Sequence, residues 1–130
     1  MANKEDRQSV TPYMGIHNAA EAIEFYKKAF GATELMRHAD PDGSVRHAEI
    51  QIGNSQLMIH DESPDFPDMK GVRPETGSPV NLFLYVDNVD AFADRAVAAG
   101  ATLFAPLENK PYGRSGGLKD PYGLTWWICN

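Results

Sequence analysis

Two five-residue stretches, GATEL (residues 31–35) and GATLF (residues 100–104), occupy matching places in the two halves of this 130-residue chain. Each stretch follows a segment with apolar residues at three- and four-residue spacing, which is the pattern of an amphipathic helix. A glycine directly after such a segment is typical of a helix C-terminus. The repeat therefore indicates two copies of one supersecondary unit.

In the first half, the apolar pattern predicts a helix that ends before Gly31, and Asn18 with Glu21 predicts a capping box at its start. Four strands are predicted around this helix, over residues 10–16, 32–38, 45–52 and 56–60.

The second half follows the same plan, with a helix that is capped by Asp87 or Asn88 and closed by Gly100. Its strands are predicted over residues 80–86, near residues 117–119 and over residues 124–129, with a Pro-Gly turn before the last strand. We expect residues 108–117 (ENKPYGRSGG) to form a loop.

The fold class that follows is α+β, with two tandem βαβββ units in a single domain that spans residues 1–130. The units should cover residues 9–62 and 79–130, form a curved eight-stranded sheet around a cavity and carry one helix each. Residues 63–78 lie in a proline-rich segment, Asp61 to Pro79, that is interpreted as a linker or flap. Whether this segment is a lid or part of a dimer interface stays open.

Composition excludes several classes of function. Twelve basic residues against eighteen acidic ones give a net charge of −6, and the basic residues are scattered, so nucleic acid is not an expected partner. Cys129 is the single cysteine, which excludes an internal disulfide. The N-terminus has no apolar targeting segment and no apolar run is long enough to span a bilayer, so we expect a cytoplasmic protein.

Strand alternation selects the side chains that face the predicted cavity. His47 and Glu49 share one face of their strand, where they could act as a base and its orienting partner or serve as polar wall residues. In the last strand Trp127 faces the cavity, whereas Trp126 faces a helix. The cavity wall is thus predicted to be largely aromatic, with contributions from Tyr13, Phe83, Tyr85 and Trp127 and with Met58 as a filler.

Four stretches carry a resemblance to a known family: AIEFYKKAFGAT (residues 22–33), HAEIQIG (47–53), LYVDNVDAFADRAVAAGA (84–101) and YGRSGGLKDPYGLTWWI (112–128). They resemble the vicinal oxygen chelate superfamily, which includes glyoxalase I, bleomycin-resistance proteins, fosfomycin-resistance enzymes and extradiol dioxygenases, and within it the PhnB-like group. The resemblance implies the paired βαβββ fold, a homodimer and functions that range from antibiotic resistance to metal-dependent catalysis.

Enzymes of this superfamily bind a divalent metal through four side chains, and the resemblance places those positions at Thr11, Met58, Asn81 and Trp127. Zinc, nickel and iron prefer imidazole or carboxylate ligands, and none of these four residues offers either. A shift of register would replace Met58 with His60, the one weak metal candidate. No cofactor is therefore predicted.

The sequence favours a metal-independent protein that binds a small molecule, aromatic or cationic, over an enzyme. The expected ligand-binding residues are Tyr13, Met58, Asn81, Phe83, Tyr85, Tyr112, Arg114 and Trp127. Arg114 has two readings, since it could hold an anionic ligand or pair with an acidic neighbour. The alternatives are a lyase, isomerase or transferase that uses His47 and Glu49 or a non-standard metal site, and a ligand-free structural or regulatory dimer.

Overall fold

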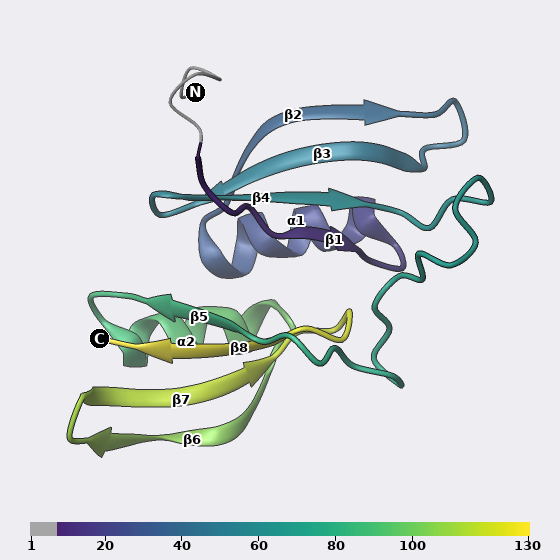
Figure 1. Ribbon diagram of the computed structural model, residues 1–130. Coiled ribbons are helices and arrows are strands. Elements are labelled where there is room, and N and C mark those ends of the chain that lie inside the picture. Colours follow the sequence, from purple (N-terminus) through teal and green to yellow (C-terminus); the bar gives the residue numbers. More distant parts are fainter. Residues whose placement is uncertain (1–7) are drawn as a thin grey trace.

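The computed structural model describes residues 8–130, which contain two helices and eight strands (Figure 1). The first unit consists of β1 (Tyr13–Gly15), α1 (Ala19–Phe30), β2 (Thr33–Ala39), β3 (Val45–Ile52) and β4 (Ser55–His60). The second consists of β5 (Leu82–Tyr85), α2 (Val89–Ala99), β6 (Thr102–Lys110), β7 (Gly113–Lys119) and β8 (Thr125–Cys129). The predicted α+β class with two βαβββ units is confirmed.

The two units have the same sheet topology. The strand orders are β1-β4-β3-β2 and β5-β8-β7-β6, and in each sheet the first and last strands of the unit pair in parallel. Figure 1 shows the sheets side by side, with β1 beside β5. The eight strands thus form two four-stranded sheets, and no strand pair in the described part of the chain joins them.

The units are joined through their helices, which lie behind both sheets in Figure 1 and contact each other. The rings of Phe30 in α1 and Phe92 in α2 stack with centroids 5.3 Å apart. The guanidinium of Arg95 donates to the carbonyl of Lys28 at 2.7 Å. Trp126 from β8 packs against α1, with its ring centroid 4.7 Å from that of Phe30. The predicted core role of Trp126 is therefore confirmed.

A buried carboxylate, Asp120, reinforces this junction. It is 5% exposed and accepts hydrogen bonds from the Tyr26 hydroxyl at 2.6 Å and from the Trp126 indole N–H at 2.9 Å. The backbone N–H groups of Tyr122 and Leu124 donate to its other oxygen. Burial, with the nearby Asp120 charge, raises the pKa of Tyr26 well above its usual value. The hydroxyl therefore stays protonated and donates to the carboxylate.

The two helix starts differ in how they are capped. Asn88 caps α2 as expected, because its side chain accepts from the backbone N–H of Ala91. The capping box predicted at Asn18 is wrong, since Asn18 adopts a left-handed conformation and its side chain caps nothing. Asp61, directly after β4, accepts the Ala19 N–H at 2.9 Å instead. The sequence around Asn18 could not indicate this cap, because Asp61 lies at the other end of the unit.

Two segments are more ordered than the sequence predicts. The expected loop at residues 108–117 is wrong, because β6 and β7 pair as a hairpin up to Lys110 and Gly113. In the connection between the units, Val72 exchanges backbone hydrogen bonds with Gly15 and His17, and forms a bridge with Ile16. The central part of this connection is thus held against the first unit. Strands β1 and β5 are shorter than predicted.

Among the residues that the structure describes, neither helix has the length and hydrophobicity needed to cross a bilayer.

Candidate functional site

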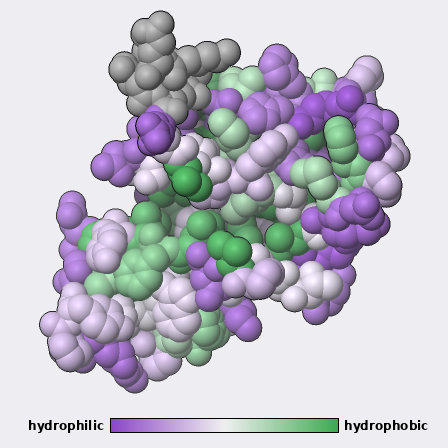
Figure 2. Space-filling model, in the orientation of Figure 1, coloured by the Kyte–Doolittle hydropathy of each residue, from purple (hydrophilic) through white to green (hydrophobic). Residues whose placement is uncertain are grey.

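Each sheet has an inner face packed on the helices and an outer face that points away from them. In β8, Trp126 and Ile128 are buried on the inner face, whereas Trp127 lies between them on the outer face and is half-buried. Figure 2 shows the outer side, where apolar side chains gather near the middle and hydrophilic ones surround them. This outer face is the candidate site.

The outer face of the second unit is aromatic. Phe83 lies beside Trp127 in the β5–β8 pairing, and the rings of Phe83 and Tyr85 are 5.1 Å apart. Phe104 from β6 meets Trp127 edge to face, with centroids 5.3 Å apart. Phe83 is 51% and Tyr85 is 74% exposed. We call these four residues the aromatic face. Exposed rings at adjacent positions are a surface on which a planar molecule can stack.

Gly117 makes this arrangement possible. It lies opposite Trp127 in the β7–β8 pairing, and a Cβ atom there would come within 2.7 Å of the Phe104 ring and 3.0 Å of the Trp127 ring. The two rings therefore occupy space that any other residue would fill. Lys119 lies with its ammonium 5.1 Å from the centroid of the Phe104 ring. Sequence reasoning missed Phe104 as a site residue, although it belongs to the GATLF repeat.

The outer face of the first unit is polar and ionisable. The Nε2 atom of His47 lies 3.0 Å from Oε2 of Glu49, and the Tyr13 ring forms T-shaped contacts with the rings of His47 and His60. The other carboxylate oxygen of Glu49 is buried without a hydrogen-bond partner within residues 8–130. Because a carboxylate only accepts, Nε2 of His47 carries the proton in this contact.

Two cavities flank the outer face. One, of about 470 Å³, lies where the units meet and is lined by residues 9–12 of the N-terminal segment, by Leu82–Leu84 and by Trp126. The other, of about 500 Å³, lies against the first unit between Tyr13, His60 and the loop that follows β4. The cavity where the units meet includes Thr11 and Phe83 of the predicted cavity wall, whereas most of the aromatic face lies outside it and is open to solvent.

The structure brings together only some of the predicted ligand-binding residues. Met58 lies beside Tyr13, and Asn81 directly precedes β5. Tyr112 is exposed in the β6–β7 turn. Arg114 points to the inner side, where its guanidinium binds Asp90 of α2 at 3.0 Å and lowers the pKa of that carboxyl. Of the two readings of Arg114, the structure shows the pairing with an acidic neighbour.

The four metal positions implied by the resemblance do not fit a divalent metal. Thr11 and Asn81 precede β1 and β5, and Met58 and Trp127 lie on the outer face. The set contains neither imidazole nor carboxylate. His60, the weak candidate, bonds through Nδ1 to the carbonyl of Asp61 at 2.8 Å. In residues 8–130 no cluster of three His, Cys, Asp or Glu side chains has metal-binding geometry.

The paired units and their open outer faces define a two-unit α+β protein of the glyoxalase fold. The chain matches the Glyoxalase/Bleomycin resistance protein/Dioxygenase superfamily over residues 14–128, and it belongs to this family. The resemblance inferred from the sequence is therefore confirmed.

Individual known proteins are similar to this chain in sequence or in fold. Rv0887c, an uncharacterized protein of Mycobacterium tuberculosis (strain ATCC 25618 / H37Rv), is 40% identical over 121 residues, which cover 91% of this chain and 71% of that protein. A PhnB protein from Bacillus cereus has the same fold, with a TM-score of 0.68, 20% identity and coverage of 95% and 98%. TnmS3 from Streptomyces sp. CB03234, an antibiotic binding protein, has a TM-score of 0.71, 23% identity and coverage of 95% and 96%.

Proposed function

We propose that this protein binds a small planar molecule on its outer face without the help of a metal. The observation that carries the proposal is the aromatic face, because Phe83, Tyr85, Phe104 and Trp127 are held in contact with one another while two of them stay largely exposed. Each aromatic contact with a ligand contributes about 0.5–1.5 kcal/mol beyond burial. Several such contacts together give a useful affinity.

The binding site is completed by a second copy of the chain. Ligand sites bury about 70–90% of a small molecule, which a single open sheet face cannot do. In a symmetric dimer, the exposed rings of one copy lie against the outer face of the other, so that both faces become walls of a closed site. Light scattering during size-exclusion chromatography is expected to give about twice the chain mass of 14.3 kDa.

Family members support the class of ligand. TnmS3 is an antibiotic binding protein, and a glyoxalase/bleomycin resistance protein from the same Streptomyces strain has the same fold. Both structures are 23% identical to this chain, so they suggest a class of compound rather than a particular one. We propose aromatic antibiotics or planar metabolites as ligands, and the cytoplasm as the place where the protein binds them.

Trp127 fluorescence tests the proposal directly. A panel of planar aromatic compounds is titrated into wild type, Trp127→Ala and Tyr112→Ala, with the heat of binding as a second readout because the first variant lacks the reporter. Trp127→Ala is expected to weaken binding about tenfold, which is about 1.4 kcal/mol. Tyr112→Ala is the control, since that side chain lies in the hairpin turn. Equal affinity of all three proteins would overturn the proposal.

A second candidate function is acid-base catalysis by His47 and Glu49. It is favoured by the 3.0 Å contact between their side chains and by the unpartnered oxygen of Glu49. A base at this position would exchange the carbon-bound protons of a hydroxyketone, so dihydroxyacetone in D₂O is a suitable probe by NMR. Wild type is expected to accelerate the exchange and His47→Gln to abolish the acceleration. An identical rate with both proteins would exclude this function.

A further inference from the structure

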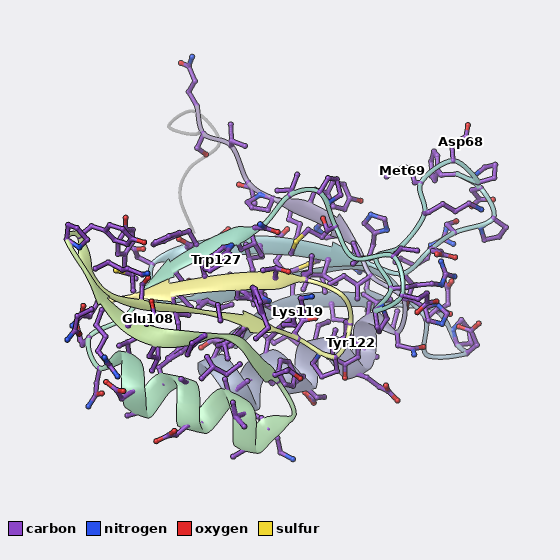
Figure 3. The ribbon with its side chains drawn as sticks, turned by 90° about the horizontal axis from the view of Figure 1, so that it is seen from below. Asp68, Met69, Glu108, Lys119, Tyr122 and Trp127 are labelled. Carbon is purple, nitrogen blue, oxygen red and sulfur yellow. The ribbon has the colours of Figure 1, made fainter. Side chains whose placement is uncertain are left out.

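The cavity of about 500 Å³ in the first unit has the size of a small-molecule site and is covered by a loop, which we call its roof. The roof is the loop after β4, whose Phe66 and Met69 line the cavity while they are 62% and 47% exposed. Figure 3 shows Asp68 and Met69 on this loop, at the opposite end of the molecule from Glu108 in β6. We call this space the loop cavity. It is separate from the aromatic face.

The wall of the loop cavity carries excess negative charge. Four carboxylates line it, Asp40, Asp42, Asp61 and Glu62, against one cationic side chain, Arg46. The charge of Glu62 is compensated by Arg73, whose Nη1 atom lies 2.6 Å from Oε1 of Glu62. Arg46 lies 3.5 Å from Asp40 and 3.8 Å from Asp65, so it is shared between two carboxylates. Within residues 8–130, Asp42 and Asp61 form no ion pair and accept backbone N–H groups. The net charge of the wall is therefore negative, which favours a cationic occupant.

A buried histidine adds a hydrogen-bond acceptor to this wall. His60 is 8% exposed and lines the cavity, and its Nδ1 atom bonds to the Asp61 carbonyl at 2.8 Å. Because a carbonyl only accepts, Nδ1 carries a proton, and in the neutral imidazole Nε2 is then the acceptor. Within residues 8–130 no group donates to Nε2. This nitrogen is available to a donor that enters the cavity.

The negative wall, the acceptor on His60 and the apolar loop above the cavity favour one chemical class of ligand. We propose that the loop cavity is a binding site for a small organic ammonium ion with an apolar body. The ammonium N–H groups donate to Nε2 of His60 and to the carboxylates of the wall, and the apolar part lies beneath Phe66 and Met69 beside the Tyr13 ring. Tyr13 is the one residue shared with the ligand set predicted for the outer face, so the two sites can be tested separately.

The test uses 2-phenylethylamine, its neutral counterpart 2-phenylethanol, and phenyltrimethylammonium, which has charge but no N–H group. Binding to the full chain is followed by NMR, with the methyl group of Met69 reporting on the loop cavity and the indole N–H of Trp127 on the aromatic face. We expect the primary amine to bind at least tenfold more tightly than the alcohol, to exceed the quaternary ion and to shift the Met69 signal. Equal binding of amine and alcohol, or shifts confined to Trp127, would refute the proposal.

Two variants locate the interaction. Asp42→Asn removes a charge but keeps an oxygen that can accept the Ser44 N–H, and Asp94→Asn on α2 is the matched control outside the cavity. Asp42→Asn is expected to weaken amine binding two- to fivefold and leave alcohol binding unchanged, with no effect of the control. His60→Gln is expected to remove the preference for the primary amine over the quaternary ion. Unchanged amine affinity in both Asp42→Asn and His60→Gln would overturn the assignment.

Discussion

The two units place different side chains at the same point of their outer faces. In the first unit, Glu49 of β3 lies opposite Met58 of β4. At the matching positions of the second unit, Gly117 of β7 lies opposite Trp127 of β8. At these positions the first sheet has a carboxylate beside a thioether. The second sheet has an indole beside a glycine, which has no side chain. The topology of the units is the same, and the chemistry of their exposed faces is opposite.

The inner faces show no such contrast. Ile59 of β4 and Ile128 of β8 are both fully buried against the helix layer. The repeat is therefore retained where the side chains form the core and lost where they face solvent. The fold depends on one face of each sheet, and the other face is free to specialise in binding.

The largest loss of stability is expected from Trp126→Ala, because Trp126 lies on the inner face of β8. Its neighbour Trp127 lies on the outer face of the same strand, so the two substitutions compare the faces. Trp126→Ala removes a buried ring and leaves an Asp120 oxygen with one donor fewer. It should lower the free energy of unfolding by about 3–5 kcal/mol. Trp127→Ala, its matched neighbour, should cost about 1 kcal/mol or less. Urea unfolding measures both, and equal losses would contradict the division between the faces.

Gly117→Ala tests whether the bare backbone is needed for the aromatic face. The added Cβ would meet the Phe104 ring at 2.7 Å, so we expect a loss of about 1–3 kcal/mol and a change in Trp127 emission. The double variant Gly117→Ala/Phe104→Ala removes the closest contact and should recover part of the loss. Losses that simply add would show that Gly117 does not act through Phe104.

Glu49→Met tests the opposite property in the first unit. The carboxylate has a buried oxygen without a partner in the described residues, so replacing it with an apolar side chain of similar size should stabilise the chain by about 1 kcal/mol. Gln51→Met, on the same face, should change stability by less than about 0.5 kcal/mol. A large destabilisation by Glu49→Met would mean that Glu49 serves the fold rather than a ligand.

The smallest effect concerns carboxylates at the edges of both units. Hydrogen bonds from Lys27 and Arg37 lower the pKa of Glu34, and Arg114 lowers the pKa of Asp90. A lowered pKa gives stability that is present above the unfolded-state value of about 4 and is lost as the pH falls through the folded-state value. Glu34→Gln and Asp90→Asn should therefore reduce Tm slightly at pH 7.

Thermal melts followed down to acid pH measure this effect, and the difference from wild type should disappear there. Solvent screening keeps both effects small. A clear difference in Tm between Glu34→Gln and Asp90→Asn would show that the two units also differ in how their ion pairs contribute to stability.

Much of the fold was predictable because its signals are local. The helix periodicity, the glycine stops and the alternation of Trp126 and Trp127 all lie within a few residues. The prediction of a capping box at Asn18 was wrong because the Ala19 N–H donates to Asp61 instead. Asp61 follows β4 and is remote in sequence. The 108–117 segment failed because its glycines suggest a loop, whereas two of them allow close packing inside a hairpin.

The site was predictable only in part. Alternation selected Tyr13, Phe83 and Trp127, but it cannot register the irregular pairing between Leu103 and Ala105 near Phe104. The orientation of Arg114 depends on an acidic partner from α2, which the sequence does not place in space. The loop cavity depends on residues from β1, β3, β4 and two connections, so no single stretch of the sequence predicts it.

Asp120 has a consequence for how this molecule can be divided. Its carboxylate lies in the second unit, yet one of its donors is the hydroxyl of Tyr26 in the first. Cutting the chain between the units would leave the Tyr26 hydroxyl without its acceptor, remove one donor from Asp120 and expose an aromatic patch in each half. Fragments of residues 1–70 and 71–130 should therefore be poorly folded alone and recover native structure only when mixed.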